Sequence, residues 1–139
     1  MLRPTSRAFL PPDRDPILCF IDTETTGLDE LRHGVRQISG CIVDTRAEED
    51  EWFDITVKPF PSDEIDHPVM ERMGVDVKEF ASYNDPIDVF HSLVNRFCEH
   101  VDRYNPLDKM VFVGYNAAFD ERFIREFWRK ADPKEGKYF

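Results

Sequence analysis

Apolar and polar positions alternate along the first half of the chain in a pattern typical of β-strands. The short apolar run at residues 16–22, PILCFID, predicts a buried central strand. Alternating apolar positions over residues 35–45 and 52–60 predict two further strands, joined by short polar turns. Three strands in such close succession favour an antiparallel meander. Gly40, inside the second strand, is expected to mark a β-bulge.

The segment after the third strand changes to helical spacing. Residues 62–74 predict a short helix that begins at Ser62 or Asp66 and stops at Gly74. Residues 85–104 give the clearest helix prediction, because a cap and a proline precede a continuous apolar stripe. The cap is Asp85, and the stripe consists of Ile87, Phe90, Leu93, Val94, Phe97 and Val101.

The last two expected elements are an apolar strand over residues 109–116 and a helix over residues 117–132. A long helix that leads into an apolar strand indicates a crossover, so this strand is expected to run parallel to the first. The expected fold class is therefore α/β: a mixed sheet, made of a three-strand antiparallel meander plus one parallel strand, flanked by helices. Residues 1–16, with four prolines and three arginines, predict an extended arm ahead of one domain over residues 17–139.

Composition narrows the class of protein. The three cysteines form no CxxC pair, so we expect reduced thiols in a reducing compartment, the cytoplasm. No apolar stretch is long enough for a membrane span, and we expect no membrane partner. The net charge of −10 argues against a generic nucleic-acid binder with a basic surface. A polyanion would instead be held by bound cations or by a small basic rim; the rim candidates, which equally fit an ordinary helix surface, are Arg122, Arg125, Arg129 and Lys130.

Two carboxylates stand at the end of the first strand. Asp22 and Glu24 alternate with Thr23, so both side chains project from one face, about 7 Å apart along the strand. Like charges this close repel each other, and a divalent cation with a preference for hard oxygen ligands, Mg²⁺ or Mn²⁺, would remove that penalty. Gly27 follows closely and permits close approach of a phosphate or sugar to the backbone. The alternative is a pair of solvated acids at an ordinary turn.

A second constellation spans residues 113–123, VGYNAAFDERF. An apolar strand ends at Gly114, Asn116 begins a turn or caps the next helix, and Asp120 lies one turn into that helix. If this strand lies parallel to the first, Asp120 reaches the same sheet edge as Asp22 and Glu24. Alternatively, Asp120 is only an acid favoured by the helix dipole.

Taken together, these two stretches are similar to a known family. FIDTETTGLDE, residues 20–30, resembles the first motif of the DEDD (DnaQ-like) 3′–5′ exonucleases, and VGYNAAFDERFI, residues 113–124, resembles the second. HPVMERMGV, residues 67–75, looks like the segment that these enzymes place beside the bound strand. The resemblance runs from about residue 17 to residue 128, and the wording TETTGL is closer to the DNA-proofreading branch than to the oligoribonuclease branch.

The resemblance implies a ribonuclease H-like fold and metal-dependent 3′–5′ hydrolysis of DNA by two Mg²⁺ or Mn²⁺ ions. By the family pattern, Asp22 bridges both ions, Glu24 holds one, and Asp120 supports the second. It also implies substrate contacts by Thr25, Thr26, Gly27, Leu28 and Asn116, with Leu28 wedged against the last bases. The alternative for Leu28 is a turn residue folded onto the core. Phe119 and Phe123 are expected to be packing residues.

The third motif of the family, with a His or Tyr general base and a fourth acid, has no counterpart after Asp120. Tyr104 and Asp108 fit the Tyr-x-x-x-Asp spacing, but they precede the second motif, so we interpret the match as coincidental. We therefore expect a portion of a longer exonuclease domain, with weak activity by itself. The expected partner is a single-stranded 3′ end, DNA over RNA, with a polymerase or replication protein as a second candidate. Two alternatives stay open: a catalytically impaired interaction domain of this fold, and an exoribonuclease.

Overall fold

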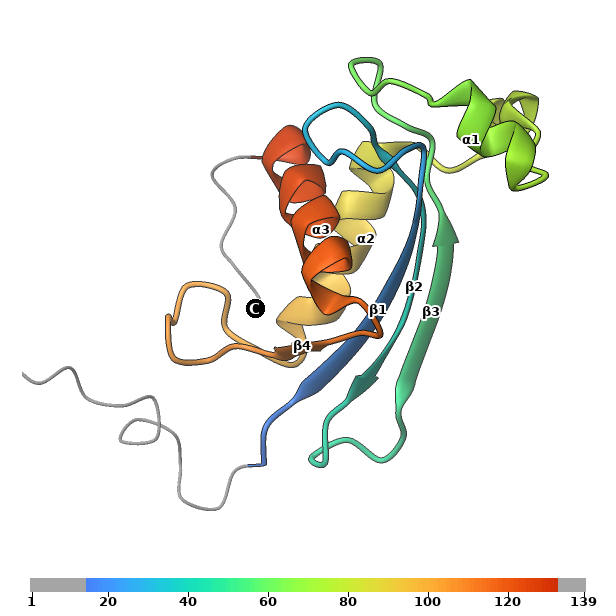
Figure 1. Ribbon diagram of the computed structural model, residues 1–139. Helices are drawn as coiled ribbons and strands as arrows, with labels where there is room; N and C mark the ends of the chain where they lie inside the picture. Colours follow the sequence, from blue (N-terminus) through green and yellow to red (C-terminus); the bar gives the residue numbers. More distant parts are fainter. Residues whose placement is uncertain (1–14, 133–139) are drawn as a thin grey trace, which may run out of the picture.

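The computed structural model describes residues 15–132, which form one mixed sheet with helices on one face (Figure 1). The strand order is β3-β2-β1-β4. β1 (Leu18–Thr25), β2 (Val35–Val43) and β3 (Glu51–Thr56) form an antiparallel meander, and β4 (Val111–Val113) pairs in parallel with β1. The predicted α/β fold class and the parallel crossover are therefore confirmed. The predicted arm, residues 1–16, lies outside the described residues except for its last two positions.

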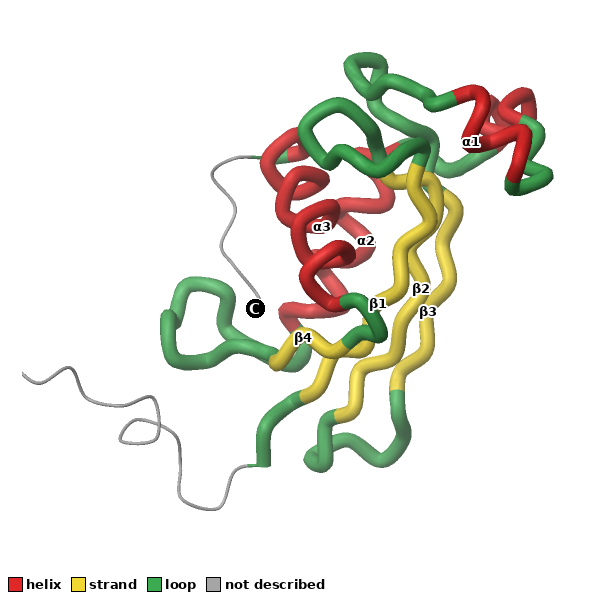
Figure 2. Tube along the Cα trace, viewed as in Figure 1, coloured by secondary structure: helices red, strands yellow, loops and turns green. Residues whose placement is uncertain are grey.

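Four helical segments follow the meander, three of them before β4 and one after it. They are α1 (His67–Arg72), the 3₁₀ segment η2 (Val77–Ser82), α2 (Pro86–Cys98) and α3 (Ala117–Ala131). Figure 2 shows α2 and α3 lying together on one face of the sheet, whereas α1 stands away from that face beyond one end of the strands. No helix in the described part of the chain is both long enough and apolar enough to cross a bilayer.

The core lies between α2, α3 and one face of the sheet. In β1, Cys19, Ile21 and Thr23 are buried, while Phe20 and Asp22 are exposed on the opposite face. Aromatic rings fill the space between helices and sheet: Phe97 contacts Phe53 edge-on and stacks on the Trp128 ring. The alternation of β1 thus sends its apolar residues into the core and its two site carboxylates to the other face.

Several predicted boundaries were wrong. The helix predicted over residues 85–104 ends at Cys98, and Val101 reaches the core from the loop that follows it. β4 contains three residues because it pairs with β1 only as far as Phe20. Ile87 is 38% exposed, whereas the neighbouring Val89 is buried on the helix face that meets the core.

Gly40 does not mark the bulge that the sequence predicts. It pairs regularly with Ile21 and Phe53, and the irregularity in the ladder falls between Glu24 and Thr25. A Cβ at Gly40 would lie 2.3 Å from the Phe20 carbonyl oxygen and 2.4 Å from the Phe53 ring. Gly40 is therefore required for close packing, not for a change in register.

Thiol reactivity tests this burial pattern. Cys98 is exposed, whereas burial raises the pKa of the Cys19 thiol to about 12. We expect a maleimide to modify Cys98 of the native protein about 100-fold faster or more than Cys19, because the thiolate is the reacting form and Cys19 must first be uncovered. Mass spectrometry of the labelled peptides measures both rates, and the rates should converge in denaturant. Equal native rates would contradict the burial of Cys19.

Candidate functional site

The two carboxylates of β1 share one face at the end of the sheet where β1 finishes. Asp22 pairs with Ser39 of β2, and Glu24 pairs with Gln37. Asp22 is exposed and accepts no hydrogen bond from the described residues, so its carboxylate is available. Glu24 is half-buried, and its Oε2 lies 3.2 Å from Nη2 of Arg36. That guanidinium is itself buried and fixes the position of Glu24.

Asp120 lies at the open edge of β1, in the first turn of α3, and is 5% exposed. Its Oδ1 accepts two hydrogen bonds from Thr23, from the backbone N–H at 3.0 Å and from the hydroxyl at 2.6 Å. Because β4 pairs only as far as Phe20, this carboxylate occupies the edge of β1 where a longer β4 would have continued. Asp120 therefore binds the residue that separates Asp22 from Glu24.

Gly114 permits this close approach between α3 and β1. A Cβ on Gly114 would lie 3.1 Å from the Ile21 carbonyl oxygen and 3.5 Å from Oδ2 of Asp120. The first distance is tight and the second is an ordinary van der Waals contact, so the turn between β4 and α3 passes directly against the backbone of β1. The expectation that the two motifs meet at one sheet edge agrees with this geometry.

The donors at this edge fit a hard divalent cation. Three carboxylates supply oxygen ligands of the kind that Mg²⁺ and Mn²⁺ prefer, and Oδ2 of Asp120 accepts no hydrogen bond from the described residues. The ligand atoms of Asp22, Glu24 and Asp120 do not all lie within 4.8 Å of one another. Among residues 15–132, the one group of three ligand atoms within 4.8 Å of one another lies elsewhere, at Glu51, Glu99 and His100.

The loop after β1 is fixed by Thr26, which is fully buried. Its hydroxyl donates to the Glu64 carbonyl oxygen at 2.7 Å and accepts from Gly34 N–H at 2.9 Å. The backbone N–H groups of Gly27 and Leu28 donate to no described residue. Thr26 thus fixes the loop from its buried side, and its side chain is not exposed for contact with a substrate.

Leu28 is 72% exposed, so the alternative in which it folds onto the core is wrong. Thr25 donates its hydroxyl to the Gly27 carbonyl oxygen at 2.6 Å and so shapes the same turn. Asn116 is exposed at the N-cap position just before α3 and makes no side-chain capping hydrogen bond. Leu28 and Asn116 therefore remain available to a ligand.

Gly27 is required because His33 packs beneath it. A Cβ at this position would lie 2.3–2.4 Å from three atoms of the imidazole ring. We expect Gly27→Ala to lower the free energy of unfolding by about 1–3 kcal/mol through overpacking, as measured by urea denaturation. A His33→Ala background provides the control, because removal of the ring should abolish most of the cost of Gly27→Ala. An equal cost in both backgrounds would show that this contact is not the cause.

Two supporting residues were missed from the sequence. Arg36 is buried and bonds both Glu24 and the Thr25 carbonyl oxygen, the latter at 3.0 Å. His33 is buried and accepts the Asp29 N–H through Nδ1 at 3.1 Å. The only signal was a lone arginine and a lone histidine in otherwise ordinary segments, and neither has a motif spacing that points to these contacts.

Each of the four candidates for a basic rim on α3 pairs with an acid, which favours the alternative of an ordinary helix surface. Arg125 and Arg129 bond Glu121 and Glu126 of the same helix, at 2.5 and 2.6 Å. The two remaining pairs join α3 to loops: Arg122 with Glu30 and Lys130 with Asp63. These pairs neutralise the cations and leave no net positive strip among them. Phe123 is buried and Phe119 partly buried against the core, which confirms both as packing residues.

The sheet face that carries Asp22 is not covered by a helix within residues 15–132 and exposes large apolar side chains beside polar ones. Phe20 and Trp52 are 41% and 77% exposed there, and an open hollow of about 850 Å³ extends from them past Asp22 to Tyr115. The carboxylate of Asp22 therefore lies at the rim of a broad surface depression.

Comparison with solved structures places this fold among known proteins. Exonuclease I from Methylocaldum szegediense superposes with a TM-score of 0.64 over 84% of this chain, at 19% identity. The fold is shared with exonuclease I. The E. coli exonuclease I in complex with a dT13 oligonucleotide gives a TM-score of 0.63 at 18% identity, also over 84% of this chain. A product-bound exonuclease I structure gives 0.64 at 17% identity.

The likeness to exonuclease I confirms the ribonuclease H-like fold that the motifs imply. This chain spans about a quarter of those proteins: 24% of the first two and 26% of the third. No family model matches the sequence, and no curated protein matches it.

Proposed function

We propose that this chain forms part of a metal-dependent 3′–5′ exonuclease that hydrolyses single-stranded DNA. The single observation that carries the proposal is the junction at the end of β1, where Asp120 of the second motif bonds the residue between Asp22 and Glu24 of the first. The fold shared with exonuclease I supports the class of reaction. A structure of the E. coli enzyme with a dT13 oligonucleotide favours DNA as the polymer.

In this proposal, Asp22, Glu24 and Asp120 hold two Mg²⁺ or Mn²⁺ ions. Bound ions of this kind polarise the scissile phosphate, lower the pKa of a water molecule and stabilise the leaving oxygen. The three carboxylates contribute three negative charges, so the site attracts cations in a chain of net charge −10. The negatively charged substrate would then be bound by the positive charge of the metal ions and not by basic side chains. We assign no general base among residues 15–132.

The chain's own residues orient these ligands. Thr23 holds one oxygen of Asp120 and leaves Oδ2 to a metal, while Arg36 holds one oxygen of Glu24. Such hydrogen bonds fix a ligand before the ion arrives. The unbonded N–H groups of Gly27 and Leu28 would bind the terminal sugar or phosphate, and the exposed Leu28 side chain would contact the last base.

End-labelled oligonucleotides test the polarity and the polymer. We expect the full chain with Mg²⁺ to shorten 5′-labelled single-stranded DNA slowly, in single-nucleotide steps, and chelation with EDTA to stop the reaction. A 3′-phosphorothioate end should slow the digestion, and a 5′-phosphorothioate end should not. Faster digestion of the matched RNA would favour the exoribonuclease alternative, and binding without digestion would favour the interaction domain.

A further inference from the structure

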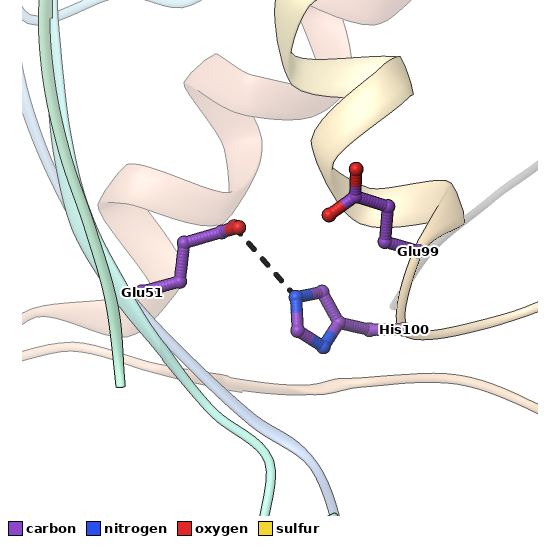
Figure 3. Close-up of side chains that lie close together, drawn as sticks. All are labelled: Glu51, Glu99 and His100. Atoms are coloured by element: carbon purple, nitrogen blue, oxygen red, sulfur yellow. Dashed lines mark ion pairs between the residues drawn. The ribbon is translucent and has the colours of Figure 1, made fainter. Parts of the chain in front are cut away.

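A second cluster of ligand-type side chains lies at the other end of the sheet (Figure 3). Glu51 is the first residue of β3, Glu99 caps the C-terminus of α2, and His100 follows directly. One ligand atom from each lies within 4.8 Å of the others. Glu51 pairs with Ile42, whereas Asp22 pairs with Ser39 farther along β2, so the cluster is distinct from the candidate active site.

The tautomer of His100 is set by Asp44, which follows β2. Asp44 Oδ2 lies 3.0 Å from His100 Nδ1, and both side chains are more than nine-tenths buried. Arg46 donates to both oxygens of Asp44, at 3.0 and 2.9 Å, so a guanidinium is paired with this carboxylate. A carboxylate can only accept hydrogen bonds, so Nδ1 of His100 is the donor in the Asp44–His100 contact.

The other ring nitrogen, Nε2, is aimed at Glu51 without a hydrogen bond. The distance from Nε2 to Glu51 Oε2 is 3.6 Å, drawn as the dashed line in Figure 3. Both atoms are buried and have no hydrogen-bond partner among the described residues. A neutral ring would point its Nε2 lone pair at a carboxylate, an arrangement that a cation bound between the two groups would stabilise.

The groups around Glu51 and His100 affect which cation could bind between them. Arg96 Nη1 lies 3.5 Å from the same Glu51 oxygen, but its guanidinium is drawn toward the Phe53 ring, at 5.4 Å from the centroid. Glu99 is exposed, which gives access from solvent, and its position at the end of α2 places it where the helix dipole favours positive charge. Arg46 also donates to the His100 carbonyl oxygen at 2.8 Å and so fixes the ligand backbone.

We propose that Glu51, Glu99 and His100 bind one Zn²⁺ ion that joins the start of β3 to the end of α2. Zn²⁺ binds both imidazole nitrogen and carboxylate oxygen, and three protein ligands would leave a fourth position for water. A histidine whose second nitrogen donates to a buried carboxylate is the usual arrangement around protein-bound zinc, and the Asp44–His100 pair has this form. The ion would join β3 to α2 at the end of the sheet away from Asp22, so it would be separate from the metal ions of the proposed nuclease site.

Zinc titration of the full chain tests the proposal, in an Asp22→Asn background so that the acids of the candidate active site contribute less. Isothermal titration calorimetry of the metal-free protein should show one tight Zn²⁺ equivalent, and Zn²⁺ should raise the midpoint of thermal unfolding. Glu99→Gln changes an exposed residue and His100→Gln removes the nitrogen ligand; each should weaken binding about 100-fold or more. Asp44→Asn should weaken it about 10–100-fold.

The matched control is His91→Gln, because His91 is an exposed histidine of α2 outside the cluster. It should leave the zinc affinity and the zinc-induced rise in the unfolding midpoint unchanged. Absence of a stoichiometric Zn²⁺ equivalent would overturn the proposal, and so would binding that survives both Glu99→Gln and His100→Gln. A His100 ring that NMR shows to remain doubly protonated with saturating Zn²⁺ would also overturn it, because the proton would then be the cation that faces Glu51.

Discussion

Replacing Asp22 with asparagine is expected to abolish the metal-dependent exonuclease activity while leaving the fold intact. The side chain is exposed and accepts no hydrogen bond from the described residues, so its charge does not contribute a packed or bonded contact to stability. In the proposed site it holds the ions, and each 1.36 kcal/mol of lost transition-state stabilisation lowers the rate tenfold. Loss of several kcal/mol predicts a fall in kcat of about 10³-fold or more.

The matched control for Asp22→Asn is Asp54→Asn, on the same open face of the sheet. Asp54 accepts hydrogen bonds from Gln37 and Ser39, and these bonds lower its pKa, but it belongs to neither motif. Single-turnover digestion of labelled DNA at saturating Mg²⁺ measures both variants, and circular dichroism measures their unfolding midpoints. Full activity of Asp22→Asn would remove this residue from the metal site.

Asp120→Ala is expected to reduce both activity and stability, in contrast with Asp22→Asn. The substitution leaves the Thr23 N–H and hydroxyl without their shared partner at a buried edge of β1. One unsatisfied buried donor costs about 1–3 kcal/mol, which urea denaturation will show as a lower midpoint at an unchanged slope. Because the same carboxylate is a proposed ligand, kcat should also fall about 10²-fold or more.

Thr23→Val separates the two roles of Asp120. It removes the 2.6 Å hydroxyl contact but retains the carboxylate and the backbone N–H that bonds it. We expect a moderate loss of stability and a rise in the Mg²⁺ concentration needed for half-maximal rate, with kcat at saturating Mg²⁺ nearly retained. If Thr23→Val changed stability without any change in the Mg²⁺ requirement, Thr23 would have no part in positioning Asp120 as a ligand.

The meander, the parallel crossover and the position of the acidic residues could be predicted from the sequence because each depends on local periodicity. Alternation in β1 alone places Asp22 and Glu24 on one face, and the apolar stripe of α2 predicts its packing on the sheet. The ends of the elements were less predictable. β4 stops early because Asp120 occupies the edge of β1, a tertiary contact between residues 97 positions apart.

The supporting contacts of the site could not be predicted for the same reason. Gly27 is needed because the His33 ring lies beneath it. Arg36 contacts Glu24 from the adjacent strand, β2. The Asp44–His100 pair joins residues 56 positions apart and belongs to no motif. The motifs thus indicated the proposed ligands, whereas the residues that contact them became visible only in three dimensions.

Binding of Mn²⁺ without substrate tests the central claim most directly, since it reports on the metal site independently of catalysis. Electron paramagnetic resonance of free Mn²⁺ measures the affinity in the full chain, in a His100→Gln background that removes the second proposed site. The account predicts Mn²⁺ binding that Asp22→Asn and Asp120→Ala each weaken about tenfold or more, and that Asp54→Asn leaves unchanged. Equal Mn²⁺ affinity in all four proteins would contradict the assignment of Asp22 and Asp120 as metal ligands.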